Sequence, residues 1–411
     1  MIAALVGAAL LATLVLQALL ALGFALVVGR RLQHKPQLAL PAPAVEVVLC
    51  LRGADPSLPA ALAALAAQTY PGPWRLQVVV DSRQDPAWTI AAAEIAALEA
   101  MGQARWQGAR LSPLAARPEQ GSLKSASLRQ AFGELDGATA VVALVDADAV
   151  VPEGWLTALV AGCGQQGIGA VSGNRWYAPE LGRGPGLVRS IWNSAALVLM
   201  TLLQIPWGGC LAVRRSLIDA GDWSAVLTTS FGEDTSLLEP LARSGLRYAF
   251  RPELLIVDRD DSINLRSLQR WLSRQMFSLR LHHPAWPLVA LHGLGTWVLV
   301  LSALVAAVLE LLKGQPARAG HLLVAVLLYE LGCVALLLVI QEVARRALLP
   351  LGSALGRPQS NQPLRLLCWV PVAQWLYGVA SLKACLARRV EWRGVYYRLR
   401  GRGVEPLSPV D

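Results

Sequence analysis

Two carboxylates, Asp146 and Asp148, follow the apolar run at residues 141–145 and are separated by a single residue. Five consecutive apolar residues predict a strand inside a parallel sheet that is covered on both faces. Ligands of open α/β sheets bind beyond the carboxyl ends of the strands, which is where these acids lie. Side chains two residues apart on an extended chain share a face, so both carboxylates could address one divalent cation or its bound phosphates. An acidic turn that only caps the strand is the alternative.

The chain before this motif alternates between predicted strands and helices, at residues 45–51, 58–68, 76–80 and 89–101. This alternation predicts a parallel sheet with right-handed crossovers, to which the strand before Asp146 adds a later member. Asp81 follows the second strand, so we expect it at the same edge of the sheet. No Gly-X-Gly-X-X-Gly follows the first strand and no Walker sequence occurs, which disfavours a dinucleotide oxidoreductase or a P-loop ATPase.

The composition indicates a membrane protein, because 55% of the 411 residues are hydrophobic. Residues 2–28 form an uncharged apolar run that ends just before Arg30 and Arg31. A run of this length spans about 30 Å of hydrocarbon, and its positive flank favours the cytoplasm. We therefore expect an anchor at residues 1–30, with its N-terminus outside, and a linker at 31–44. A cleaved signal peptide is the alternative, but no basic segment precedes the run.

Apolar segments return in a membrane-associated region at 285–387, with three candidate spans at residues 286–312, 322–344 and 364–386. The tail at 388–411 is rich in arginine, which favours the cytoplasmic side. Three full crossings from a cytoplasmic start would leave this tail outside. One segment is therefore expected to be re-entrant or interfacial. Together these features predict an integral protein of the inner or plasma membrane whose catalytic part faces the cytoplasm.

The charge and the cysteines limit the partners. A net charge of +9 with arginine beside the apolar runs favours an anionic membrane surface. No basic stripe with interleaved aromatic residues occurs in the part predicted to be soluble, so we expect no nucleic acid partner. The six cysteines are scattered without a Cys-X-X-Cys pair, and they are interpreted as small buried side chains and not as metal ligands.

Seven short motifs occur in order along residues 45–280. They are Arg52-Gly53-Ala54-Asp55-Pro56, Gln68-Thr69-Tyr70-Pro71, Asp81, Asp146-Ala147-Asp148, Gly208-Gly209, Gly232-Glu233-Asp234 and Gln269-Arg270-Trp271. In this order they resemble the inverting, membrane-bound family 2 glycosyltransferases. The first motif, Asp81 with Asp85-Pro86-Ala87, and the terminal Glu391-Trp392-Arg393-Gly394 are most similar to the ceramide glucosyltransferase group. The resemblance implies a GT-A-like, Rossmann-like, mostly parallel α/β sheet in a cytosolic catalytic domain at 45–284, between N-terminal and C-terminal transmembrane helices.

The resemblance also implies a binding site for a nucleotide-sugar donor. It implies that Asp81 contacts the base, that Asp146 lies near the ribose and phosphates, and that Asp148, with Asp146, coordinates Mg²⁺ or Mn²⁺. A cation suits this chemistry because negative charge grows on the diphosphate as the sugar leaves. Lys124 stands where such enzymes often have a lysine near the nucleotide, and a solvated helix end is its alternative.

The second half of the reaction needs a base that takes the proton of the acceptor hydroxyl. The resemblance gives this role to Asp234, while Glu233 would orient neighbouring groups. Asp234 precedes an apolar helix, so it could instead be an N-cap; both roles can hold at once, because a helix N-terminus keeps a carboxylate ionised.

The resemblance implies that Arg270 supplies a guanidinium for the diphosphate and that Trp271 forms an aromatic wall of the acceptor channel. Ser267 departs from the family pattern, which has glutamine or arginine at the first position of Gln/Arg-X-X-Arg-Trp. Three neighbouring residues could substitute for the missing group: Arg266, Gln269 and Arg274. A basic helix at the membrane surface is the alternative for this whole segment.

Residues 187–204 place polar side chains on one side of an apolar helix, which predicts a helix in the membrane interface, with an ordinary buried helix as the alternative. An active site at the bilayer surface suits an acceptor that stays in the membrane. Together with this position, the resemblance implies transfer of a sugar, from a UDP-hexose or similar donor, to a hydroxyl of ceramide, diacylglycerol or a related lipid, with inversion. A processive polysaccharide synthase and a non-catalytic lipid-binding protein on the same fold are the alternatives.

Overall fold

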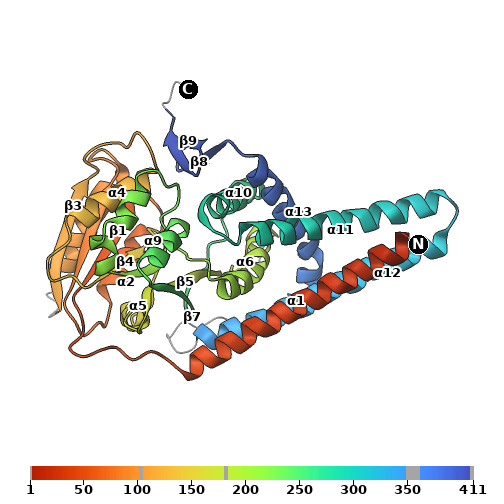
Figure 1. The fold of residues 1–411 in the computed structure, drawn as a ribbon, viewed down its shortest axis with the longest axis horizontal. Helices are drawn as coiled ribbons and strands as arrows, with labels where there is room; N and C mark the ends of the chain where they lie inside the picture. The colour runs from red at the N-terminus through yellow and green to blue at the C-terminus, as the bar shows by residue number, and fades with distance from the viewer. Residues whose placement is uncertain (1, 101–104, 180–183, 349–361, 408–411) are drawn as a thin grey trace.

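The computed structural model describes residues 2–100, 105–179, 184–348 and 362–407 (Figure 1). A sheet with helices on both faces forms one end of the molecule, and long helices extend from it to the other end. The last residue of the helix predicted at 89–101 lies outside the described residues, as do 349–361 of the predicted membrane region and 408–411 of the tail.

A seven-stranded sheet with the order β3-β2-β1-β4-β6-β5-β7 forms the core of the region predicted to be catalytic, called the catalytic part below. Its strands are β1 (Val45–Leu51), β2 (Trp74–Val80), β3 (Trp106–Pro113), β4 (Val141–Val145), β5 (Ile168–Tyr177), β6 (Cys210–Arg214) and β7 (Arg247–Asp258). The pairs β1–β2, β2–β3, β1–β4 and β5–β7 are parallel, whereas β6 runs antiparallel to β4 and β5. The predicted α/β fold with a mostly parallel sheet is confirmed.

Helices cover both faces of this sheet, so that every residue of β4 is buried. One face packs mainly against α2 (Leu58–Ala66), α3 (Pro86–Ala100) and α5 (Trp155–Cys163). The other packs against α4 (Leu123–Gly133), α8 (Asp222–Leu227) and α9 (Leu238–Arg243), with the short helices α7 (Arg215–Asp219) and η1 (Thr235–Leu237) nearby. Burial on two faces is the physical reason why the strands are apolar runs and do not alternate.

Long helices attach to the second face of the sheet. Among the described helices, four are long and apolar enough to cross a membrane: α1 (Ile2–Gln33), α6 (Gly184–Leu203), α11 (Trp286–Leu312) and α12 (Pro316–Leu348). Phe24 of α1 and Ala344 of α12 belong to the same buried cluster as Val142 of β4, so the helices are fixed directly to the sheet. Leu11 and Leu19 leave 63% and 60% of their surface exposed, as expected for a face that lipid would cover.

Three helices pack together beside α1, α11 and α12 (Figure 1). They are α6, α10 (Leu265–His282) and α13 (Gln362–Leu386). Most of α6 is buried inside the protein, where it packs with α10 and α13 around a common apolar cluster. In the described part of the chain α13 does not reach the hydropathy of a candidate span, and it contains Pro371.

The tail folds into a three-stranded antiparallel sheet, β8 (Arg389–Trp392), β9 (Val395–Arg400) and β10 (Gly403–Pro406). This sheet packs on the catalytic part, because Tyr397 and Val404 share a buried cluster with Phe231 and Leu123. The carbonyl oxygen of Val404 accepts from the N–H of Gly121 at 2.7 Å. The basic tail, expected only as a charged segment, is therefore a docked element of the catalytic end.

Candidate active site

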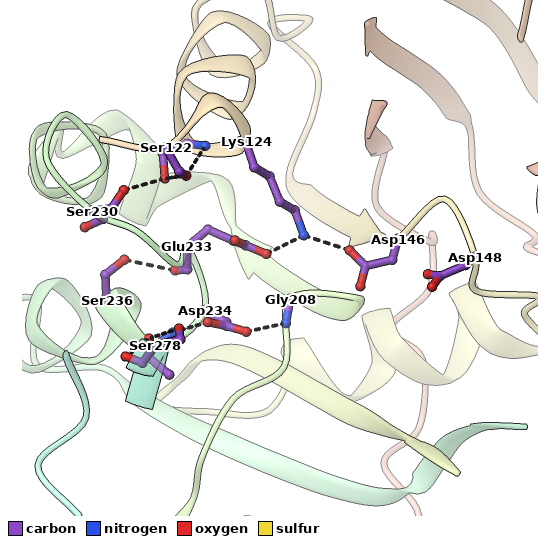
Figure 2. A network of polar contacts seen from close by, with 12 residues as sticks. Ser122, Lys124, Asp146, Asp148, Gly208, Ser230, Glu233, Asp234, Ser236 and Ser278 are labelled. Atoms are coloured by element: carbon purple, nitrogen blue, oxygen red, sulfur yellow. Dashed lines mark hydrogen bonds and ion pairs between the residues drawn. The ribbon is translucent and has the colours of Figure 1, made fainter. Parts of the chain in front are cut away.

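The acidic residues predicted from the sequence meet at the carboxyl edge of the sheet. Asp81 follows β2, and Asp146 and Asp148 follow β4, which are separated in the sheet by β1 alone. The loop before η1 brings Glu233 and Asp234 to the same place (Figure 2). The sheet topology therefore joins carboxylates that are separated by up to about 150 residues of chain, as expected at the ligand-binding edge of an α/β sheet.

Lys124 links two of these carboxylates. It lies in the first turn of α4, whose N-terminus is capped by Ser122, and its Nζ is 2.7 Å from Oδ1 of Asp146 and 2.6 Å from Oε1 of Glu233 (Figure 2). Burial alone would lower the pKa of Lys124, but Asp146 and Glu233 outweigh it and raise this pKa well above its usual value. The lysine is thus a permanent cation within the site and not a solvated helix end.

Asp234 is half-buried at the start of η1. Its carboxylate accepts from the backbone N–H of Gly208 at 3.0 Å and from that of Thr235 at 2.6 Å, so the predicted cap contact is present (Figure 2). Burial and the neighbouring Glu233 raise the pKa of Asp234 to about 7, against the lowering effects of Lys124 and the two N–H groups. A carboxylate with such a pKa is matched to proton transfer near neutral pH.

The loop at Gly208 requires glycine. A Cβ at this position would collide with the carboxylate of Glu233. The close approach lets the Gly208 N–H reach Asp234 while Glu233 remains against Lys124. The glycine pair at 208–209 thus serves the geometry of the two acids.

Asp148 has a partner that the sequence reading missed. The guanidinium of Arg175, on β5, contacts both of its carboxylate oxygens, at 2.7 Å and 2.5 Å, and also lies 3.1 Å from Oδ2 of Asp258. Burial would raise the pKa of Asp148, but Arg175 lowers it below the usual range. The available signal was an arginine inside a strand whose ten residues are all buried, since a buried charge is paired.

The donor set bears on the expected cation. In residues 2–100, 105–179, 184–348 and 362–407 no group of three or more His, Cys, Asp or Glu side chains could hold a metal ion. Mg²⁺ is commonly held by one or two carboxylates together with substrate phosphates and water. Asp146 and Asp148 fit a cation that is shared with a phosphorylated ligand in this way, provided that Arg175 releases Asp148.

Asp81 has one engaged and one free carboxylate oxygen. Its Oδ2 contacts Arg52, and Nη2 of Arg117 is 3.3 Å away. Its Oδ1 is buried, and within the described part of the chain it has no hydrogen-bond partner. An unsatisfied buried acceptor is costly, so this oxygen is suited to accept from a ligand N–H.

The structure does not bring Arg270 to the acids. This side chain is exposed, with its Nη2 3.3 Å from Oγ of Ser267. Arg274, one helical turn further along α10, points to the site instead, and its guanidinium lies 5.6 Å from the ring of Trp392. Trp271 packs edge-on against Trp192, where it forms part of a cavity wall. Arg274 is one of the three substitutes that the Ser267 departure suggested.

Two cavities meet at these residues. The polar pocket, of about 190 Å³, includes Asp81, Lys124 and Arg274 in its wall. The large cavity, of about 940 Å³, extends from the acids between the helices α1, α6, α11, α12 and α13, and Trp271 lines it. Residues in the walls of both are Asp146, Asp148, Trp207, Asp234, Arg274, Gln275 and Ser278. The acids thus stand at the junction between a polar pocket and a mostly apolar one.

Comparisons with known proteins show what this chain is similar to. No curated protein matches its sequence. Mannosyltransferase PcManGT from Pyrobaculum calidifontis, in complex with GDP-Man and Mn²⁺, matches over 92% of this chain and 99% of its own, with 17% identity and a TM-score of 0.51. That likeness shows a shared GT-A-like fold.

A second solved structure, M. tuberculosis glucosyl-3-phosphoglycerate synthase in complex with Mn²⁺ and uridine-diphosphate-glucose, covers 58% of this chain and 78% of its own, with 18% identity and a TM-score of 0.38. This value is too low to carry an argument. The family match is far more extensive, because the model of glycosyl transferase family 21 covers residues 10–404. The resemblance to glycosyltransferases is confirmed at this level, and the chain belongs to glycosyl transferase family 21.

Proposed function

We propose that this protein transfers a hexose from a nucleoside diphosphate sugar, of which a UDP-hexose is the first candidate, to the hydroxyl group of a membrane lipid with inversion of configuration. The observation that carries this proposal is the position of Asp234 in the walls of both cavities. A base at such a junction can touch an acceptor from one side while the donor lies on the other.

The polar pocket suits the donor. The free Oδ1 of Asp81 can accept a base N–H, and the ammonium of Lys124 and the guanidinium of Arg274 supply positive charge for the diphosphate. A divalent cation held by Asp146 and Asp148 would neutralise charge on the leaving group. The solved relative PcManGT, in complex with GDP-Man and Mn²⁺, supports this use of the fold.

Asp234 would act as the general base. The acceptor oxygen attacks the anomeric carbon from the face opposite the diphosphate, its proton passes to the Asp234 carboxylate, and the electron pair of the broken sugar–oxygen bond goes to the diphosphate. One displacement inverts the anomeric centre. Burial, together with Glu233 fixed on Lys124, keeps the pKa of Asp234 high enough for proton transfer near neutral pH.

One part of the large cavity suits the hydrocarbon chains of a lipid. Among the described residues, the part of its lining that α1, α11, α12 and α13 supply contains no Asp, Glu, Lys or Arg. Polar but uncharged side chains such as Gln17 and Thr296 occur there among apolar ones. This part of the lining can surround the hydrocarbon chains of a lipid, whereas the arginines of the cavity wall, Arg175, Arg189, Arg259 and Arg274, belong to other elements.

The docked tail supports a specific topology. Since the tail sheet contacts the catalytic part, an even number of membrane crossings separates the two. We propose that α11 and α12 cross the membrane and that α13, which is less apolar, does not. Arg30 and Arg31 in the last turn of α1 support a cytoplasmic position for the catalytic part and the tail, because basic flanks favour that side. Two crossings after the catalytic part would leave the tail on the side that its arginines favour.

The proposed activity is tested with membranes that contain the full-length protein and a panel of radiolabelled sugar nucleotides, followed by extraction with organic solvent. We expect label in an extractable glycolipid for one donor. Label retained in insoluble polymer would instead support a processive synthase. Absence of label in any lipid, from a protein that binds no sugar nucleotide, would refute the proposal and support a non-catalytic lipid-binding protein.

A further inference from the structure

The hairpin between β8 and β9 ends in an unusual turn. Trp392 pairs with Val395, so that only Arg393 and Gly394 connect the strands. Both have positive φ, 50° for Arg393 and 76° for Gly394. Two-residue turns of this kind favour asparagine or glycine at their first position, and an arginine there is under backbone strain. Strained residues gather at functional sites, so the contacts of Arg393 bear on its function.

The turn lies at the polar pocket. Its wall includes Trp392, Arg393 and Tyr397. They are more than 150 residues in sequence from Asp234, the nearest acidic residue that lines the same pocket. Nε of Arg52 donates to the carbonyl oxygen of Arg393 at 2.9 Å. The guanidinium of Arg393 lies 2.9 Å from Oδ2 of Asp55. Arg52 also contacts Asp81, so the turn is joined to the residue proposed to bind the base.

Two guanidinium groups face the pocket from this side. Arg274 packs against the ring of Trp392 and, among the described residues, forms no ion pair. Burial and the nearby charge of Arg393 lower the pKa of Arg274. Asp55 balances part of the charge of Arg393, but Arg274 has no such partner among the described residues. An anion bound between the two guanidinium groups would remove the repulsion that remains.

We propose that the β8–β9 hairpin is part of the donor site and that Arg393 binds the diphosphate of the nucleotide donor together with Arg274. This inference rests on the proposed function. The tail then closes the polar pocket from the side opposite the sheet, and the strain at Arg393 is tolerated because no asparagine or glycine could supply a guanidinium.

A purely structural role of the hairpin is the competing explanation. The tail is anchored elsewhere, by the buried Tyr397 and Val404 and by backbone hydrogen bonds to the loops at residues 121 and 229. A change at the turn therefore need not undock the tail. Arg400 provides a matched control, because it lies on β9, pairs with Glu405, leaves 64% of its side chain exposed and lines neither cavity.

The test uses the full-length protein in lipid nanodiscs with Mn²⁺. Binding of UDP and GDP is compared with binding of uridine and guanosine by isothermal titration or by competition with a labelled nucleotide. For the nucleotide that binds, Arg393→Asn is expected to weaken binding of the nucleoside diphosphate about tenfold or more. The affinity for the nucleoside should stay within about twofold, and Arg400→Asn should change neither. The midpoint of thermal unfolding should rise in Arg393→Asn, because asparagine suits a positive φ.

Weaker diphosphate binding together with a higher midpoint of thermal unfolding would show that Arg393→Asn affects binding and does not damage the fold. Unchanged UDP or GDP affinity in Arg393→Asn would overturn the inference, and so would an equal loss for nucleoside and diphosphate. If the parent protein binds neither UDP nor GDP, the proposed function fails, and the inference about Arg393 fails as well because it rests on that function. If the parent binds and the variant binds equally well, the proposed function stands and only the role of the hairpin is refuted.

Discussion

The guanidinium of Arg175 lies against both carboxylate oxygens of Asp148, with Nη1 to Oδ2 at 2.7 Å and Nη2 to Oδ1 at 2.5 Å. In this arrangement the arginine occupies the oxygens that the proposed cation needs. Asp258, 3.1 Å from the same guanidinium, can hold Arg175 when Asp148 is engaged elsewhere. The arginine and the cation therefore compete for one carboxylate.

This competition predicts the effect of Arg175→Gln on metal binding. Loss of the guanidinium should tighten Mn²⁺ binding about tenfold, because the cation no longer displaces a buried ion pair. Electron paramagnetic resonance of free Mn²⁺ measures this without turnover. Arg215→Gln, which removes the half-buried partner of Asp219 outside both cavities, is the control. Weaker Mn²⁺ binding in Arg175→Gln would show that the arginine organises the site and does not compete for it.

The raised pKa of Asp234, about 7, predicts the pH dependence of the reaction. Only the ionised carboxylate can accept a proton, so kcat/KM should rise with pH, reach half its plateau near pH 7 and be about a hundredfold lower at pH 5. Glu233 is one cause of the raised pKa, so Glu233→Gln should shift the rising limb to lower pH. A profile that is flat from pH 5 to 8 would be inconsistent with Asp234 as the base.

Lys124 is predicted to stabilise the fold as well as the donor. Replacement by methionine leaves Glu233, whose side chain is only 5% exposed, without its cation. Loss of one partner of a buried ion pair costs about 3–5 kcal/mol in the free energy of unfolding. The double variant Lys124→Met/Glu233→Gln should regain much of that loss in denaturant unfolding. Equal stability of the parent and Lys124→Met would mean that the lysine is solvated.

The two arginines of α10 should differ in their contributions. Arg274 lines both cavities, whereas Arg270 is exposed and lines neither. Arg274→Ala should therefore lower kcat/KM roughly 10²-fold, the usual cost of losing one group that stabilises developing charge. Arg270→Ala should have little effect. The reverse order, measured with the same donor, would restore the assignment that the motif alone suggested.

Local sequence predicted the elements that depend on local pattern. The apolar run at β4 and the alternation before it were sufficient for the mostly parallel sheet, because burial on both faces leaves a distinct composition. The antiparallel direction of β6 could not be predicted in this way. Direction depends on which strands become neighbours, and the five residues of β6 carry no mark of it.

The site was predictable where one motif sufficed and not where distant elements meet. Asp146 and Asp148 were found from their spacing, but Arg175 reaches Asp148 from another strand. Arg270 was favoured over Arg274 because it stands in the family motif. The rotation of α10 decides which arginine faces the site, and it is fixed by packing that sequence does not reveal. In the tail, alternation of Tyr397 and Leu399 with Arg398 and Arg400 was a strand signal that the overall positive charge of the segment obscured.

The central claim is that Asp234 takes a proton from a lipid hydroxyl at the junction of the two cavities. The most direct measurement compares Asp234→Asn with the parent protein for sugar-nucleotide binding and for transfer to extracted lipid. Asparagine retains the size of the side chain and its oxygen acceptor, but it cannot accept the proton. We predict donor affinity close to that of the parent and transfer slower by about 10²–10⁴-fold. Transfer by Asp234→Asn at the parent rate would contradict the account and reduce Asp234 to the cap of η1.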